Sequence, residues 1–233
     1  MEKNKSTIKY QLIQSNRKTI VISISADGNI TVKAPRHLGA EEIAELVQLK
    51  SRWIEKKLTE QKRMNQNWTP KKYIDGETFL YLGKSHTLLR IIDHKYKKPV
   101  VKLEGDFLIV MAGDSDQSQL KQSVELWYRT QAKKVIPERV KEYSQYIEET
   151  FETIRIKDQK KRWGSCSSKG NLNFNWRLIM APVQILDYVV VHELCHLKHM
   201  DHSKAFWNHV ADILPNHQEC RKWLKDYGIR LYC

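Results

Sequence analysis

The sequence predicts an α+β fold, with a β-rich front half and a mostly helical second half. In the front half, short runs that alternate apolar and polar residues are separated by Gly- and Asp-containing turns, as in antiparallel sheets. Beyond residue 120, apolar residues recur mostly at helical spacing, and only two further stretches have the character of strands. The 233 residues suffice for one large domain or two small ones, and 41% hydrophobic residues can form a core.

Strands are expected at the start of the chain. Residues 8–13 and 19–25 alternate apolar and polar side chains. The pair Asp27-Gly28, followed by residues 30–32, is typical of a hairpin turn that leads into a partner strand. The sequence therefore predicts an N-terminal antiparallel sheet.

A single amphipathic helix follows this sheet. Apolar residues recur at helical spacing between Ile43 and Leu58, which predicts a helix of about five turns. The polar stretch 61–72 is expected to be a loop. Four further strands are expected after it, at residues 78–82, 87–92, 99–103 and 107–111.

The stretch 112–118 is rich in Gly, Asp and Ser, and it is the predicted domain boundary. It separates a β-rich N-terminal domain with one amphipathic helix, residues 1–113, from a second domain, residues 114–233. Helical sequence at residues 120–150 opens the second domain, and Pro137 is expected to kink or divide that helix.

The second domain continues with two strands and then with helices. The strands are expected at residues 153–156 and 172–178. Pro182 is typical of the first turn of a helix, and the apolar residues after it extend this helix to about residue 200. One or two further helices are expected from Ser203 onward, interrupted at Pro215.

The chain carries an excess of positive charge. Forty Lys and Arg residues against 27 Asp and Glu residues give a net charge of +13. The excess is concentrated in the front half, because residues 1–110 hold 21 basic and 12 acidic side chains. This balance favours anionic substrates or polyanionic partners, although a basic surface can also simply keep a protein soluble. No nucleic-acid-binding motif accompanies it.

Targeting signals and disulfide patterns are not apparent. The sequence has no run of roughly 18 apolar residues that could cross a bilayer, and its start lacks the apolar segment of a secretory signal. A cytoplasmic protein without a membrane partner is therefore expected. Free thiols are expected at all four cysteines, which form no CxxC pair: Cys166, Cys195, Cys220 and Cys233.

The segment His192-Glu193-Leu194-Cys195-His196 predicts a metal centre. On a helix, histidines four residues apart lie on one face and can bind one Zn²⁺ ion. Glu193, beside the first histidine, can reach a water on the metal and take its proton as that water attacks a carbonyl or phosphoryl group. We therefore expect a zinc-dependent hydrolase with one zinc ion per chain.

A catalytic zinc ion commonly has three protein ligands, and the third must be sought downstream. His202 is the preferred candidate, because a residue beyond a helix end near Met200 can approach the metal from a new direction. A straight helix would carry His199 too far along its axis. The remaining candidates are His209, His217, Asp212 and Glu219. Asp201 is expected to cap a helix or to orient an imidazole.

Five segments carry a resemblance to a known family: residues 162–167 (RWGSCS), 172–178 (LNFNWRL), 181–182 (AP), 186–196 (LDYVVVHELCH) and 202–207 (HSKAFW). In them the chain resembles the YgjP-like metal-dependent hydrolases, relatives of SprT-like and other zincin metallopeptidases. The resemblance extends over most of the chain. It implies a zincin-like catalytic domain in residues 114–233, with His192, His196 and His202 as zinc ligands and Glu193 as the catalytic base.

The resemblance also implies that the strand from Trp163 to Cys166 lies near the cleft, where an extended peptide could pair with its edge. Alternatively, Trp163 and Trp176 are core aromatics and Gly164 is a turn or bulge. Two arginines, Arg162 and Arg177, could bind an anionic group or stabilise an oxyanion. They could equally form surface ion pairs.

Three functions remain open at this point. The first is a zinc metallopeptidase that acts on peptides or proteins. The second is hydrolysis of a nucleotide phosphoanhydride, as by a nucleoside triphosphate pyrophosphatase, which the positive charge permits and the resemblance also suggests. The third is a nucleic-acid-associated protein whose basic front half binds the polyanion.

Overall fold

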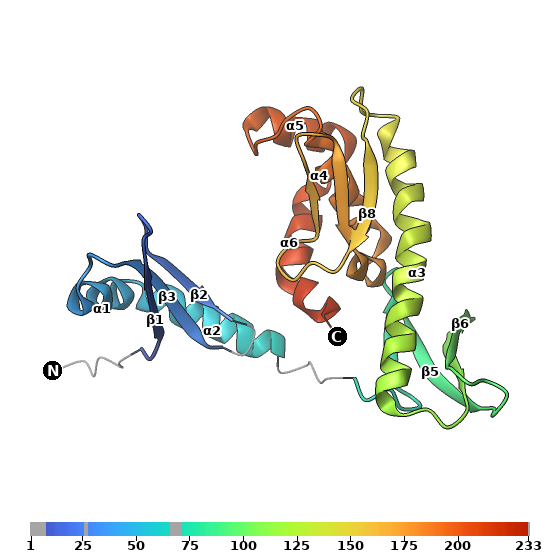
Figure 1. Ribbon diagram of the computed structural model, residues 1–233. Coiled ribbons are helices and arrows are strands. Elements are labelled where there is room, and N and C mark those ends of the chain that lie inside the picture. The colour runs from blue at the N-terminus through green and yellow to red at the C-terminus, as the bar shows by residue number, and fades with distance from the viewer. Residues whose placement is uncertain (1–7, 26–27, 66–70, 233) are drawn as a thin grey trace. The chain divides into compact units, whose positions relative to one another are not determined.

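Two separate hydrophobic cores divide the chain into two units. The computed structural model describes residues 8–25, 28–65 and 71–232. Unit 1 is Met1–Thr69 and unit 2 is Pro70–Cys233 (Figure 1). The described residues form three small sheets and six α-helices, so the predicted α+β class is confirmed. The division does not follow the predicted boundary at 112–118, because the strands before that stretch share the core of unit 2.

Unit 1 contains a sheet of three strands in the order β1-β3-β2: β1 (Gln11–Ser15), β2 (Val21–Ile24) and β3 (Ile30–Pro35). The pair β2–β3 is the expected antiparallel hairpin, although Asp27 of its turn lies outside the described residues. Strand β1, however, runs parallel to β3, so the sheet is mixed and the expected all-antiparallel arrangement is wrong. The cause is that the chain reverses direction between β1 and β2 and again between β2 and β3, so β1 and β3 point the same way, and β3 lies between the other two strands.

Two helices cover this sheet where one was expected. Helix α1 (Ala40–Leu49) and helix α2 (Ser51–Asn65) are separated at Lys50, which caps the first helix. The break lets both helices contribute to one core, which contains Ile43 and Ile54 together with Val32 of β3.

Unit 2 begins with the four predicted strands: β4 (Thr78–Tyr81), β5 (Lys84–Ile92), β6 (Val100–Glu104) and β7 (Phe107–Ala112). Their order in the sheet is β4-β5-β7-β6. The central pair β5–β7 is parallel, and the outer pairs are antiparallel, so this sheet is mixed as well.

Helix α3 (Gln117–Ser144) runs along unit 2 and connects its two halves (Figure 1). Asp116 starts it, because the Asp116 carboxylate accepts a hydrogen bond from the backbone N–H of Gln119. The helix continues through Pro137 without division. Its buried face packs against β6 at one end and against β8 and α4 further along.

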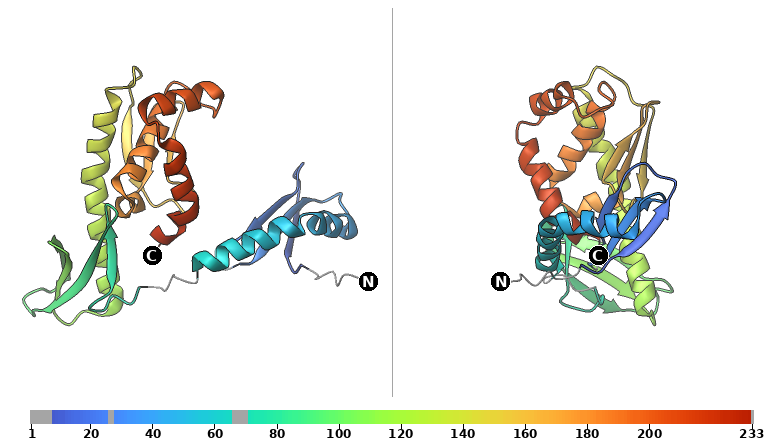
Figure 2. Two further views of the ribbon diagram at one scale, coloured as in Figure 1. Left: turned by 180° about the vertical axis from the view of Figure 1, so that it is seen from behind. Right: turned by 90° about the vertical axis from the view of Figure 1, so that its left-hand side faces the viewer.

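A second sheet follows α3, with the strand order β8-β10-β9: β8 (Thr153–Lys157), β9 (Gly164–Cys166) and β10 (Asn171–Asn175). Strand β10 ends at Asn175, earlier than the predicted residue 178. There the Asn175 side chain accepts a hydrogen bond from the backbone N–H of Arg177 and starts the 3₁₀ helix η1 (Trp176–Met180). Helices lie on one face of this sheet (Figure 2, right).

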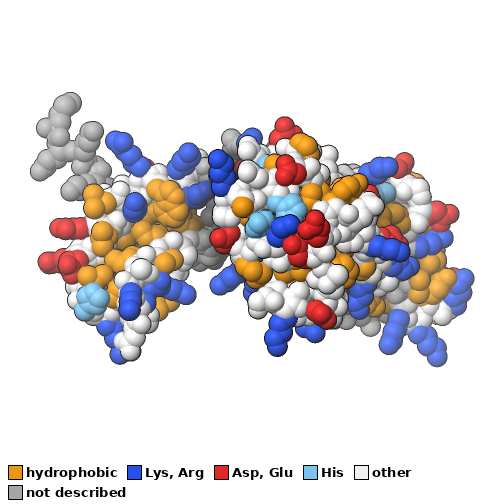
Figure 3. Space-filling model, turned by 90° about the horizontal axis from the view of Figure 1, so that it is seen from above, with side chains coloured by type: hydrophobic (Ala, Val, Ile, Leu, Met, Phe, Trp, Pro, Cys, Tyr) orange, Lys and Arg blue, Asp and Glu red, His pale blue; other side chains and the backbone are white. Residues whose placement is uncertain are grey.

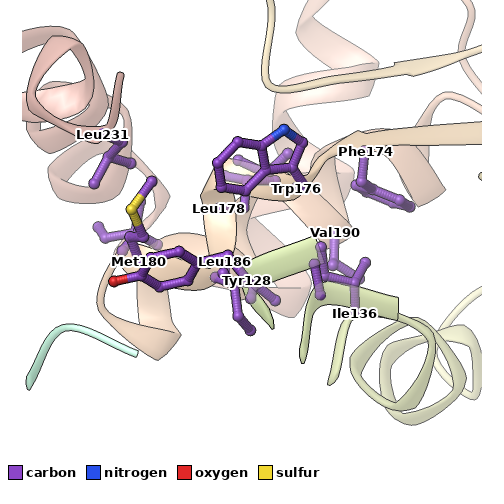
Figure 4. Packing of buried hydrophobic residues seen from close by; sticks show 14 of the residues in the cluster. Tyr128, Ile136, Phe174, Trp176, Leu178, Met180, Leu186, Val190 and Leu231 are labelled. Carbon is purple, nitrogen blue, oxygen red and sulfur yellow. The ribbon is translucent and has the colours of Figure 1, made fainter. Parts of the chain in front are cut away.

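Four further helical elements complete the chain: α4 (Val183–Cys195), α5 (Lys204–Ile213), α6 (His217–Tyr227) and the 3₁₀ helix η2 (Gly228–Leu231). Pro215 lies between α5 and α6, as predicted. Figure 4 shows Tyr128 and Ile136 of α3 facing Leu186 and Val190 of α4 in the core. This packing fixes the position of α4, the helix that carries the histidine motif.

None of the helices in the described part of the chain is long and apolar enough to cross a membrane. Cys166, Cys195 and Cys220 are free thiols, as predicted, and Cys233 lies outside the described residues.

Candidate metal centre

Helix α4 is buried on nearly all sides. Ten of its 13 residues are buried, which is typical of a helix in the middle of a domain. Two of the buried residues are acidic, Asp187 and Glu193. Asp187 accepts hydrogen bonds of 2.6 and 2.7 Å from Arg139 of α3 and one of 3.2 Å from the Tyr143 hydroxyl. This buried ion pair ties the motif helix to α3.

The motif histidines lie at the C-terminal end of α4. The ring centroids of His192 and His196 are 4.8 Å apart, as expected for residues four apart on a helix. The helix ends at Cys195, earlier than the sequence indicated, and the chain turns so that the His199 carbonyl oxygen lies 2.8 Å from His196 Nδ1. Because a carbonyl only accepts, Nδ1 carries the proton and the Nε2 lone pair of His196 is free.

The turn after α4 brings a third imidazole to this pair. The Ser203 side chain, and not that of Asp201, caps α5. The Asp201 carboxylate accepts a hydrogen bond from the backbone N–H of Ser203 and so stabilises the turn that leads into the helix. His202, between them, places its Nε2 atom 3.2 Å from Nε2 of His192. One ligand atom each from His192, His196 and His202 lies within 4.8 Å of the others. Figure 3 shows histidine side chains (pale blue) gathered at the surface of this unit.

This arrangement suits a metal ion. Nitrogen ligands about 2.0–2.1 Å from a tetrahedral zinc ion lie roughly 3.3 Å from one another, close to the Nε2–Nε2 distance observed here. Burial lowers the pKa of His192 to about 3 and lowers that of His196 as well, so both rings are neutral at pH 7. Three imidazoles with converging nitrogen atoms could hold a metal ion.

Aromatic side chains of α5 support the three imidazoles. The Phe206 ring is fully buried and stacks on His196 at a centroid distance of 4.5 Å. The Trp207 ring stacks on His202 and also lies near His192, in both cases 5.7 Å between centroids. These contacts limit the rotation of the imidazoles and hold their nitrogen atoms together.

Glu193 lies beside this cluster on the inner side of the helix and is 5% exposed. Burial raises the pKa of Glu193 to about 8, while a hydrogen bond from the Cys166 backbone N–H and the charge of Arg162 act in the opposite direction. A cation bound at the histidines would also favour the ionised carboxylate. The side chain fits only because residue 164 is glycine: a Cβ atom there would lie 2.5 Å from Glu193 Oε1.

Strand β9 is the edge of its sheet on this side. In the ladder with β10, Ser165 lies opposite Asn173. Two positions away on either side, the Asn175 N–H donates to the Trp163 carbonyl and the Ser167 N–H donates to the Asn171 carbonyl. The alternation of an antiparallel ladder then turns the N–H and C=O groups of Gly164 and Cys166 away from β10. The Cys166 N–H faces Glu193, in agreement with the hydrogen bond between them.

A family model for the YgjP-like metallopeptidase domain matches residues 18–227. The chain belongs to the YgjP-like family. No curated protein sequence matches it significantly.

Two solved structures resemble part of this YgjP-like protein. One is the crystal structure of the metallopeptidase zymogen abylysin of Pyrococcus abyssi, with 22% identity, a TM-score of 0.36, and coverage of 39% of this chain and 94% of that chain. The other is the metallopeptidase zymogen jannalysin of Methanocaldococcus jannaschii, with 25% identity, a TM-score of 0.34, and coverage of 38% and 92%. At these TM-scores the similarity is partial, and the family assignment comes from the sequence match.

The other candidate ligands of the YgjP-like protein lie outside the cluster. His199 pairs with His209, with 5.7 Å between ring centroids, and only its backbone carbonyl contacts a motif histidine. His217 stacks on the outer side of Trp207. Neither Asp212 nor Glu219 joins the group of convergent donors found among the described residues.

The two arginines considered from the sequence have different surroundings. Arg177 forms an ion pair of 2.5 Å with Asp158 and stacks on Trp176, so it belongs to an ion-pair network. Arg162 instead lines a pocket of about 270 Å³ beside the histidine cluster. Trp163 and Gly164 of the β9 segment line the same pocket, whereas Trp176 is a core residue.

Sequence reasoning did not identify several residues around this centre. Tyr188, one turn before His192, lines the pocket, and its ring lies 5.9 Å from that of His192. Phe206 and Trp207 contact the imidazoles from α5. The signal was available in part, because two adjacent aromatic residues follow His202 by four and five positions, one helical turn away.

Proposed function

We propose that this YgjP-like protein is a zinc-dependent metallopeptidase with one zinc ion per chain, held by His192, His196 and His202. The observation that carries the proposal is the convergence of three imidazole nitrogen atoms beside a buried glutamate. Neutral imidazoles suit zinc better than they suit magnesium or calcium, which prefer oxygen ligands. A bound zinc ion would polarise the substrate carbonyl and bring the pKa of a coordinated water toward neutrality.

Glu193 is the proton acceptor in this proposal. Its carboxylate is held by the Cys166 N–H and lies against Gly164, so it has one preferred orientation beside the histidines. From there it takes the proton of the attacking water and then passes it to the leaving amine. The buried position excludes bulk water, which would otherwise compete for that proton.

The outer edge of β9 binds the substrate in this proposal. Gly164 directs its N–H and C=O away from β10, and Cys166 directs its C=O the same way while its N–H bonds to Glu193. An extended peptide can pair with such an edge. A peptide bound there would pass alongside Glu193, because the Glu193 carboxylate contacts both residues. A substrate in extended conformation, such as an unfolded segment, fits this edge better than a folded protein.

The direct test compares two substrate classes. The purified full chain, loaded with zinc, is incubated with denatured casein and, in a separate reaction, with nucleoside triphosphates. We expect cleavage of casein that stops when a chelator removes the metal and returns when zinc is restored. Consumption of the nucleotides with intact casein would contradict the proposal and would instead support phosphoanhydride hydrolysis.

A further inference from the structure

Helix α6 presents a basic surface next to the candidate metal centre. An open groove of about 810 Å³ is bordered by Trp207, His217, Arg221, Lys222, Lys225 and Asp226. Three of these side chains are cationic and one is anionic. The groove therefore has a net positive charge, and one of its walls, Trp207, also contacts two of the candidate ligands.

Arg221 has a defined position in this groove. Its guanidinium lies over the Trp207 ring, 4.8 Å from the ring centroid, and the same ring lies 5.7 Å from the imidazole of His192. Arg221 and two of the candidate zinc ligands thus lie against the same aromatic ring.

Arg221 differs in its ion pairing from three other arginines that lie on aromatic rings. Arg129, Arg139 and Arg177 also contact aromatic rings, and each of them pairs with a carboxylate. Among the described residues, no carboxylate lies within ion-pair distance of Arg221. The acidic residue of the groove, Asp226, is 3.9 Å from Lys222 instead. A guanidinium held against a ring, with no carboxylate beside it, is suited to bind an anion from outside.

We propose that Arg221 and Trp207 form a subsite for a carboxylate on the substrate peptide, close to the bond that is cleaved. This inference rests on the proposed peptidase function. An extended peptide advances about 3.3 Å per residue, so the distances through Trp207 place the carboxylate within about three residues of that bond. The carboxylate can belong to an acidic side chain or to the C-terminus of the peptide, and both bind a guanidinium in the same way.

The test uses the zinc-loaded full chain and four versions of one cleavable peptide. They carry Glu or Gln near the cleaved bond, each with a free or an amidated C-terminus. We expect a higher kcat/KM for the peptide versions whose carboxylate, from Glu or from the free C-terminus, reaches Arg221 than for the version with Gln and an amidated C-terminus. Arg221→Gln should reduce kcat/KM for those versions about tenfold, mainly through KM, and should leave the fully neutral peptide nearly unchanged. Arg221→Lys, which keeps the charge but not the planar fork, should be intermediate.

Two controls separate this subsite from general charge effects and from catalysis. Arg155→Gln removes the same charge from exposed strand β8, at the opposite edge of the sheet from β9, and should keep the carboxylate preference. Calorimetric titration of zinc-loaded Glu193→Gln with the Glu and Gln peptides measures binding without turnover. The Glu peptide should bind more tightly, and adding Arg221→Gln should abolish the difference.

The possible failures are distinguishable. If no peptide is cleaved in a zinc-dependent manner, the proposed function is wrong and this inference is wrong with it. If peptides are cleaved but Arg221→Gln keeps the carboxylate preference, the function stands and the subsite is refuted. A loss confined to nucleoside triphosphate hydrolysis would also overturn the inference, because the groove would then bind phosphate.

Discussion

A Cβ atom added to Gly164 would lie 2.5 Å from Oε1 of Glu193 and 2.6 Å from its Cγ. No pair of real atoms of these types approaches so closely without displacement, so the glycine and the glutamate depend on each other. The glycine therefore has a role beyond turn formation: it creates the space in which the carboxylate of the motif helix lies beside the three histidines.

Gly164→Ala should displace the Glu193 carboxylate while leaving the histidines in place. We expect zinc content to remain near one per chain and peptide hydrolysis to fall by roughly 10² to 10⁴-fold, as for loss of a general base. Elemental analysis and turnover measured on the same preparation test this. Wild-type turnover in the variant would show that the position of Glu193 is not critical.

The three histidines should differ sharply from their neighbour His199. His202→Ala should lower zinc affinity strongly and abolish activity, because it removes one of three converging donors. His199→Ala should leave zinc affinity nearly intact, because His199 contacts His196 through its backbone carbonyl, which the substitution preserves. Competition with a chromophoric chelator measures both affinities. The reverse order of effects would show that the ligand assignment is wrong.

Asp187→Asn should destabilise unit 2. It removes the buried carboxylate that accepts two hydrogen bonds from Arg139 and leaves that guanidinium without its main partner. We expect the free energy of unfolding to fall by about 3 kcal/mol, as for a broken buried ion pair whose other member is partly exposed. Urea unfolding measures this, with Lys198→Ala as the control, because its exposed ion pair with Glu148 contributes less than about 1 kcal/mol. Equal effects of the two substitutions would contradict the account.

The Cys166 thiol should react slowly although it is only half-buried. Burial, and secondarily the charge of Glu193, raise the pKa of Cys166 to about 11. At pH 7.5 only about one such thiol in three thousand is ionised, and the thiolate is the reactive form. Iodoacetamide labelling, followed by mass spectrometry of the Cys166 peptide, should be slow in the native protein and fast in concentrated urea. Similar labelling rates in native buffer and in urea would show that the fold does not raise the pKa of the Cys166 thiol.

The motif helix and its histidines could be predicted because both signals are local. Pro182, the apolar run that follows it and the four-residue spacing of His192 and His196 all report on one helix. The end of that helix could not be predicted. The helix ends at Cys195, and beyond it the His199 carbonyl oxygen contacts Nδ1 of His196. No pattern of residue types in the sequence predicts this contact.

The strands were also predictable one by one, whereas their partners were not. Alternating side chains indicate that a segment forms a strand, but they do not show in which direction it pairs, so the parallel pairs β1–β3, β5–β7 and β8–β10 were not predicted. The division of the chain was misplaced for a related reason. The stretch 112–118 has the composition of a linker, yet Leu108 and Val110 before it and Leu120 after it belong to one core.

The measurement that tests the central claim most directly is zinc content together with peptide turnover in Glu193→Gln. The substitution keeps the size of the buried side chain and removes its ability to accept a proton. We predict that the variant retains one zinc ion per chain, is as stable as the wild type and has lost turnover by orders of magnitude. Loss of the metal would make Glu193 a ligand, and undiminished turnover would exclude it as the base; either result would contradict the proposed mechanism.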